Sequence, residues 1–310
     1  MPSPIRKPLP AAPVWLPPNI WEQIESTGSD AFLAAYSHGL RIERWGGTLR
    51  LVSPVPPSDS LRFSLLNPPA PRAWKPNRVL FHCEGAPTAE ILLGSGYAGE
   101  AKELGLTYGI DLTPGIAPGL FPDQRDNRIR LRSLRPQKLL NLFAHTLFAH
   151  TCAFGAIAAA HGAETLNIDS SARSLQRGKE NYERNQLSGP RHRFWTEDVR
   201  RILPRLARRG EKFDAVILDP PTFAHGGRGR AFRIQRELEP LLLACLPLLA
   251  PRASMLLSIN ESNTTSASLE TWARETLHRE GISARLEPGQ KPPDVPSDRM
   301  PATLWIFPED

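Results

Sequence analysis

From residue 122 onward, short apolar runs alternate with segments in which apolar residues recur at helical spacing. The predicted strand–helix pairs are Lys138–Phe143 and Ala153–Ala160, Thr165–Ile168 and Ala172–Asn185, Arg193–Trp195 and Val199–Arg208, Ala215–Leu218 and Gln235–Leu249, and Ser254–Ile259 and Leu269–Glu280. Two more strands, Ser283–Leu286 and Ala302–Phe307, follow without a helix between them, so we expect an antiparallel pair to close the sheet. This alternation is typical of an α/β fold with a doubly wound, mostly parallel, seven-stranded sheet.

The N-terminal part of the chain follows a different pattern. Pro-rich residues 1–18 predict a flexible arm, residues 19–118 a small strand-rich domain, and residues 119–310 the α/β domain. A short helix is expected over Ile20–Tyr36. The remaining expected elements are a hairpin of Leu40–Trp45 and Thr48–Val52 about the Gly46-Gly47 turn, and strands at Arg78–His82, Ala89–Leu93 and Leu106–Leu112.

The charge of the chain is regional. Lys and Arg total 38 against 32 Asp and Glu, a formal net charge of +6. Arginines gather in residues 125–135, 200–209 and 228–236, and such clusters form a phosphate-contacting surface if the fold brings them together. An Arg-rich composition can also reflect nothing more than the nucleotide composition of a genome.

Cysteine spacing and hydropathy exclude several protein classes. The three cysteines are far apart, which favours neither a disulfide framework nor a structural zinc site, so no metal is expected. No apolar run approaches the ~20 residues of a membrane span, and prolines at positions 2, 4 and 8 disfavour a signal peptide. We therefore expect a cytoplasmic protein with no membrane partner.

Polar residues follow the predicted strands at the edge where a doubly wound sheet binds its ligands. Asp169 and Ser170 end the second strand of the α/β domain, where an acid can accept hydrogen bonds from both hydroxyls of a ribose. Asp198 follows the third strand, where a carboxylate can accept from an adenine amino group. For both acids the alternative is a helix N-cap.

The fourth strand ends in the most specific pattern, Asp219-Pro220-Pro221-Thr222-Phe223. Two prolines fix two φ angles and remove two amide donors, so carbonyl groups and the Asp219 carboxylate can face a ligand. A planar amino group could donate to Asp219 and the Pro220 carbonyl while Phe223 stacks on its ring. The alternative is a tight turn in which Asp219 caps a helix.

Four ordered motifs resemble the S-adenosylmethionine-dependent methyltransferases of the bacterial large-subunit rRNA methyltransferase I/K type. These motifs are residues 120–128 (LFPDQRDNR), 140–146 (LNLFAHT), 167–169 (NID) and Asp219–Phe223, and the resemblance covers about residues 104–260. It implies a Rossmann-like domain with S-adenosyl-L-methionine as cofactor, Asp169 on the ribose, Asp198 on the adenine, and Asp219, Pro220, Pro221 and Phe223 as the catalytic turn. The donor-binding residues that it implies are Arg125, Asn127, Asn141, Phe143, His145, Thr146, Asp169, Ser170, Asp198 and Asp219.

The donor loop departs from the family pattern. The segment LFAHT at 142–146 is repeated without change at 147–151, which adds five residues where the family runs directly into a helix. Five residues preserve neither helical phase nor strand alternation, so the extra copy must bulge as a loop or displace the other copy. We place His145 and Thr146 of the first copy in the functional position. An alternative is a donor site broken by the repeat, which would leave a non-catalytic RNA-binding scaffold.

The fifth strand also departs from the pattern, because Asn260-Glu261-Ser262 follows it in place of a cysteine. Cytosine C5 methylation needs a thiolate nucleophile there, so a nitrogen target fits better. The sequence therefore predicts a methyltransferase that modifies a nitrogen of a base in RNA, with ribosomal RNA as the expected partner. A methyltransferase of a protein amide or a small molecule is the rival enzyme, since planar amides fit the same turn.

Overall fold

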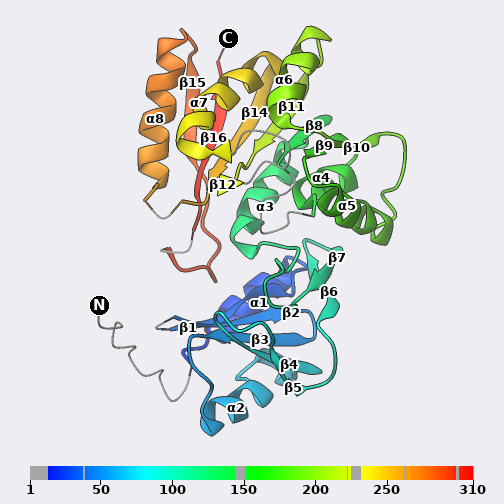
Figure 1. Cartoon of the computed structure of the whole chain (residues 1–310), viewed down its shortest axis with the longest axis vertical. Coiled ribbons are helices and arrows are strands. Elements are labelled where there is room, and N and C mark those ends of the chain that lie inside the picture. Colours follow the sequence, from blue (N-terminus) through cyan, green and yellow to red (C-terminus); the bar gives the residue numbers. More distant parts are fainter. Residues whose placement is uncertain are drawn as a thin grey trace. The chain divides into compact units, whose positions relative to one another are not determined.

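The computed structural model describes residues 13–37, 39–143, 151–221, 223–224, 232–261, 263–297 and 300–309. The chain divides into two compact units, one of Met1–Pro118 with Pro293–Pro296 and one of Gly119–Pro292 with Ser297–Asp310, whose elements are labelled in Figure 1. Within the described ranges, no helix is both long and apolar enough to cross a membrane.

The first unit is built on a five-stranded sheet of order β1-β2-β3-β4-β5, in which only β3 and β4 pair parallel. Its elements are α1 (Pro18–Ser26), β1 (Ala31–Ser37), β2 (Leu40–Trp45), β3 (Thr48–Ser53), α2 (Asp59–Leu66), β4 (Arg78–Cys83), β5 (Glu90–Leu93), and the hairpin of β6 (Ala98–Glu103) and β7 (Leu106–Asp111). The predicted β2–β3 hairpin is confirmed. Gly46 at its turn has φ 59°, and an added Cβ would lie 2.5 Å from the Glu100 carbonyl oxygen.

The helix expected over Ile20–Tyr36 is wrong in its second half. The helix α1 ends at Ser26, Gly28 adopts φ 78°, and the chain continues as β1. A short apolar run such as Ala31–Tyr36 fits a buried strand as well as a helix, and pairing with β2 decides for the strand.

The second unit contains the predicted sheet, with strand order β10-β9-β8-β11-β14-β16-β15. The first five strands of this order pair parallel, whereas β16 pairs antiparallel with both β14 and β15. The fold prediction is therefore confirmed, including the closing pair. The strands are β8 (Lys138–Leu142), β9 (Glu164–Asp169), β10 (His192–Thr196), β11 (Phe213–Leu218), β14 (Leu249–Ile259), β15 (Ala284–Pro288) and β16 (Ala302–Pro308).

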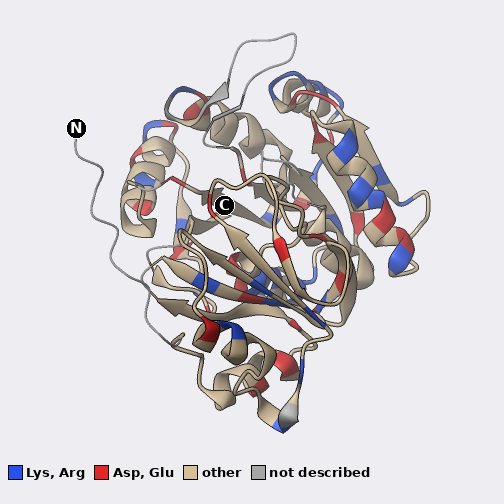
Figure 2. Cartoon of the chain, turned by 60° about the horizontal axis from the view of Figure 1, so that its bottom comes forward, with Lys and Arg blue, Asp and Glu red and all other residues tan. Residues whose placement is uncertain are grey.

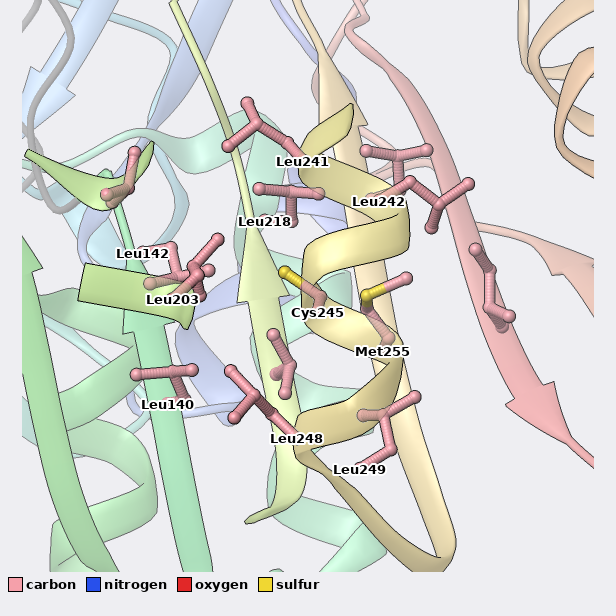
Figure 3. Close-up of a cluster of buried hydrophobic side chains, with 14 of the residues drawn as sticks. Leu140, Leu142, Leu203, Leu218, Leu241, Leu242, Cys245, Leu248, Leu249 and Met255 are labelled. Carbon is pink, nitrogen blue, oxygen red and sulfur yellow. The ribbon is translucent and has the colours of Figure 1, made fainter. Parts of the chain in front are cut away.

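The helices of this unit cover the two faces of the sheet. They are α3 (Arg125–Leu134), α4 (Ala153–Ala160), α5 (Ala172–Arg184), α6 (Val199–Arg208), α7 (Ile234–Cys245) and α8 (Ser266–Arg279). One buried cluster joins α6, α7 and α8 to the sheet, and Figure 3 shows part of it, with Leu203 of α6 and Leu241, Leu242 and Cys245 of α7 beside strand residues. This core fixes the strand ends from which the candidate site is built.

Candidate active site at the strand ends

The carboxyl ends of β8, β9, β10, β11 and β14 meet at one edge of the parallel sheet. The chain order runs outward from β8 through β9 to β10 on one side, and through β11 to β14 on the other. The topological switch point therefore lies between β8 and β11. Ligands of open α/β sheets bind in the crevice outside this point.

Asp169 ends β9 and is 2% exposed. Its Oδ1 accepts a hydrogen bond from the Ser171 backbone amide at 2.5 Å, and its carbonyl accepts from the Glu197 amide at 2.9 Å. The N-cap of α5 is Ser171, whose hydroxyl accepts from the Ser174 amide, so Asp169 does not serve as that cap. Ser170 is exposed between them. The ribose role of Asp169 and Ser170 stays a prediction.

Asp198 caps α6, as the alternative interpretation of this residue expects. Its Oδ1 accepts from the Arg200 backbone amide at 2.9 Å, and its Oδ2 lies 2.6 Å from the Arg200 guanidinium. The hydrogen bond from this guanidinium lowers the pKa of the Asp198 carboxyl below its ordinary value, so the carboxylate is charged at neutral pH. The cap and the predicted adenine contact use the same carboxylate.

The loop after β8 has unusual backbone geometry at both described ends. Phe143 has φ 54° and Cys152 has φ 57°, in the left-handed region that non-glycine residues rarely adopt. Such strain clusters at ligand-binding turns, which agrees with a donor-binding place for Phe143. The predicted donor residues His145 and Thr146 lie outside the described residues.

Asn141 of β8 is buried in a polar network on the α4–α5 face. Its Nδ2 donates to Asn167 Oδ1 at 2.9 Å, and Asn167 Nδ2 donates to the Tyr182 hydroxyl at 3.2 Å. The Tyr182 hydroxyl lies 2.9 Å from the Thr165 hydroxyl. These contacts give Asn141 a structural task beneath the strand ends, and its donor contact stays a prediction.

Arg125 and Asn127 open α3 and are buried. Asn127 Nδ2 donates to Gln124 Oε1 at 2.8 Å, and Asn127 Oδ1 accepts from the Trp305 indole at 2.9 Å. Gln124 Nε2 in turn donates to the Ser258 hydroxyl at 2.9 Å. Asn127 therefore joins α3 to β16 and β14, a long-range role that its place in the sequence does not reveal.

The turn after β11 is packed into the protein. Asp219 is 7% exposed, and Pro220 and Pro221 are buried. Phe223 belongs to the short strand β12 (Phe223–Ala224), which pairs antiparallel with β13 (Phe232–Arg233). The structure thus brings Asp219 to the same strand-end edge as Asp169, whereas it describes Phe223 only by its backbone. The catalytic roles of this turn stay predictions.

One acid at this edge was missed by sequence reasoning. Glu261 lies two residues beyond the end of β14, in the same position relative to its strand as Ser171 to β9. The strand-end rule that singled out Asp169 would have found it.

The comparisons with known proteins agree with this geometry. A family model described as S-adenosylmethionine-dependent methyltransferase matches residues 78–305, so the chain belongs to this family. The resemblance expected from the motifs is thereby confirmed. Its members use S-adenosylmethionine as the methyl donor.

Curated relatives match about half of the chain. Ribosomal RNA large subunit methyltransferase I of Tolumonas auensis is 34% identical over 154 residues, 49% of this chain and 37% of the relative. Ribosomal RNA large subunit methyltransferase K/L of Syntrophotalea carbinolica is 34% identical over 181 residues, 57% of this chain and 24% of the relative. The chain thus matches well under half the length of either relative.

Solved structures share the fold over most of the chain. The SMU.776 chain complexed with SAH has a TM-score of 0.72 at 20% identity and covers 93% of this chain and 78% of its own. The SAM-dependent methyltransferase from Agrobacterium tumefaciens has a TM-score of 0.68 at 22% identity and covers 90% of both chains. At such identities the likeness shows the fold alone.

Proposed function

We propose that this protein transfers the methyl group of S-adenosylmethionine to a nitrogen of a base in ribosomal RNA. The observation that carries the proposal is the buried Asp219-Pro220-Pro221 turn, at the end of β11 beside the switch point of the sheet. The names of the curated relatives support the RNA substrate. Since ribosomes are the target, we assign the protein to the cytoplasm.

The residues at the end of β9 fit the donor. Asp169 supplies a carboxylate acceptor for ribose hydroxyls, and the exposed Ser170 beside it supplies a hydroxyl. When bound, the donor supplies a methyl group on a positively charged sulfur. Residues 1–12 of the predicted arm lie outside the described residues. We assign residues 19–118 to a domain that helps to select substrate and residues 119–310 to the catalytic domain.

The Asp219 turn would orient the acceptor. An amino group of the base donates to the Asp219 carboxylate and to the Pro220 carbonyl, which aims the nitrogen lone pair along the line of the sulfur–methyl bond. A bound donor would supply the methyl group and leave as S-adenosylhomocysteine, while Asp219 would accept the proton that the nitrogen loses and pass it to water. Phe223 stacks on the ring.

The cysteines support a nitrogen target over cytosine C5. Burial raises the pKa of Cys245 to about 12, and this residue lies in the α6–α8 core. Burial and the nearby Asp169 charge raise the pKa of Cys152 as well. Both side chains are therefore thiols at neutral pH, and Cys83 belongs to the other unit.

An arginine face on α6 supports a polyanionic partner. Figure 2 shows acidic and basic positions interleaved over much of the chain. The sequence of α6 differs from this pattern. Its exposed residues include Arg201, Arg205, Arg208 and the following Arg209, and Val199–Arg209 contains no acid. Arg205 pairs with Glu197 at 3.3 Å, whereas the other three form no ion pair within the described part of the chain. Such a face suits RNA phosphates.

Methyl transfer to hypomethylated large-subunit ribosomal RNA tests the proposal. At a saturating donor concentration, we expect Asp219→Ala to lower the transfer rate at least ~100-fold, the size of a lost general base. Glu183→Gln, an exposed change on α5, is the matched control and should keep full activity. Mass spectrometry of the digested nucleosides should place the methyl group on nitrogen. Undiminished transfer by Asp219→Ala, or a methyl group on carbon, would refute the assignment.

The LFAHT repeat favours a second candidate, a scaffold that binds RNA without methylating it. The repeat falls in the loop between β8 and α4, where the donor's methionine end is expected. A folded protein that binds RNA but no donor would establish this candidate in place of the enzyme.

A further inference from the structure

A recess lies at the carboxyl end of β14, between the beginnings of α7 and α8. Its volume is about 310 Å³, within the usual range of small-ligand sites. It is lined by Ile234, Leu238, Glu239, Ile259, Glu261, Thr264, Ser268, Leu269 and Trp272. None of these residues belongs to the predicted donor site or to the Asp219 turn.

The walls of this recess, which we call the α7–α8 pocket, are largely apolar. Ile234 and Leu238 come from α7, Ile259 from β14 and Leu269 from α8. Trp272, one turn further along α8, adds a partly buried indole. An indole flanked by aliphatic side chains offers a flat surface on which another ring can stack.

One carboxylate defines the polar side of the pocket. The Thr264 hydroxyl donates to Glu261 Oε2 at 3.1 Å, and the Thr264 amide donates to the Glu261 carbonyl at 3.0 Å. These bonds hold Glu261 at the pocket wall. A carboxylate accepts several hydrogen bonds at once, so the bond from Thr264 is compatible with a further donor from a ligand.

The other polar groups of the pocket have structural tasks. Glu239 accepts from the Arg279 guanidinium at 3.0 Å, which balances its charge. The Ser268 hydroxyl accepts from the Thr265 amide at 2.9 Å in the capping box of α8. The pocket therefore presents the Glu261 carboxylate and the face of an indole, groups that can accept from an amino group and stack on a flat ring.

The pocket neighbours the acceptor turn. Strands β11 and β14 pair parallel with Leu218 opposite Leu257. Asp219 follows the first of these residues directly, and Ile259 of the pocket lies two residues beyond the second. Both features therefore lie at the same edge of the sheet, on adjacent strands.

We propose that the α7–α8 pocket binds a nucleobase with an exocyclic amino group, belonging to a nucleotide that flanks the methylated one. The amino group donates to Glu261 while the ring lies against Trp272. Uracil has no exocyclic amino group, and its one ring donor, N3–H, lies between two carbonyl oxygens that would repel the carboxylate, so the pocket favours adenine, cytosine or guanine over uracil. This inference rests on the proposed RNA substrate.

Titration with nucleoside monophosphates, followed by saturation-transfer NMR, tests the pocket. We expect AMP and CMP to bind about tenfold more tightly than UMP, the value of one charge-assisted hydrogen bond. Glu261→Gln should reduce this preference to less than threefold, and Trp272→Leu should weaken all the nucleotides. Glu275→Gln, an exposed change on the same helix outside the pocket, is the matched control and should preserve the tenfold preference.

Equal binding of UMP and AMP, or a preference that survives Glu261→Gln, would overturn the proposal. Tighter binding of N-acetyl-arginine amide than of any nucleotide would also overturn it, because the pocket would then take a protein side chain. Methyl transfer to RNA, measured on the same preparation, distinguishes a failure of the pocket proposal from a failure of the proposed methyltransferase function. Methyl transfer without a base preference would refute the proposed role of the pocket but keep the methyltransferase function. Absence of donor binding would refute the methyltransferase function itself.

Discussion

The Asn141 carboxamide on β8 donates a hydrogen bond of 2.9 Å to Asn167 on β9, directly beneath the strand ends that form the candidate site. Asn167 is 0% exposed and Asn141 is 4% exposed. Buried amides of this kind are costly unless they are bonded, and here they fix two adjacent strands through a specific geometry. The network thus holds Asp169, two residues beyond Asn167, in a defined position.

Gly155 of α4 lies against this network, and an added Cβ would come 2.3 Å from Asn167 Oδ1 and 2.6 Å from the Tyr182 hydroxyl. We expect Gly155→Ala to lower the free energy of unfolding by ~1–3 kcal/mol, because the overpacking outweighs the gain in helix propensity. Urea denaturation measures the change. Gly189→Ala, where the added Cβ meets nothing within 4 Å, is the control. Equal stability of the two variants would show that the contact is not tight.

The Asp198–Arg200 pair predicts a pH-dependent stability. Because the pKa of Asp198 is lowered in the folded protein, its charge stabilises the fold above the ordinary carboxyl pKa, and this contribution is lost as the pH falls through the lowered value. Asp198→Asn keeps a capping group and should cost ~0.5 kcal/mol at pH 7, whereas Asp198→Ala should cost ~1–2 kcal/mol. The deficit of Asp198→Asn should shrink progressively as the pH falls below the ordinary carboxyl value of ~3.9. A deficit independent of pH would contradict the ion pair.

The arginine face of α6 predicts a change in salt dependence. Replacing Arg201, Arg205 and Arg208 together by Gln should weaken binding to ribosomal RNA fragments. The slope of log Kobs against log salt should become less steep by about 2–3, since each lost phosphate contact removes ~0.7–0.9. Arg274→Gln, on the exposed side of α8, is the control. An unchanged slope would show that α6 is merely a solvated surface.

The three cysteines should differ in reactivity. We expect iodoacetamide at pH 8 to label only half-buried Cys83 in the folded protein, because burial raises the pKa of both Cys152 and Cys245. The Cys83→Ser variant should therefore take up no label until it is unfolded, and it should keep full methyl transfer. Loss of transfer in this variant would point to a thiolate mechanism.

Sequence reasoning predicted the sheet of the second unit because its strands are buried apolar runs and its helices have one apolar face, two patterns that local sequence displays. Sequence reasoning failed where contacts between residues far apart in the chain determine the secondary structure or the role of a side chain. The run Ala31–Tyr36 becomes a strand through pairing with β2, and Asn127 bonds to Trp305 far along the chain. The sequence also did not predict the α7–α8 pocket, because Trp272 looks like an ordinary core residue until α7 and β14 are placed around it.

Asp198 shows a further limit of sequence reasoning. A carboxylate after a strand fits both a ligand contact and a helix cap. The structure shows the cap, in which Asp198 Oδ1 accepts from the Arg200 backbone amide, and the Arg200 guanidinium pairs with the same carboxylate. Asp169 differs from Asp198 because it is not a helix cap. Ser171 caps α5, and the buried Asp169 carboxylate lies at the edge of the candidate site.

Isothermal titration of the protein with S-adenosylmethionine, alongside S-adenosylhomocysteine, tests the central claim most directly. We predict saturable 1:1 binding with a Kd in the micromolar range, about −8 kcal/mol, and a loss of at least ~tenfold in Asp169→Asn but not in Glu183→Gln. This result would place the donor at the end of β9 despite the repeated loop. Absence of binding, in a protein that melts cooperatively, would contradict the account and leave an RNA-binding scaffold in place of the enzyme.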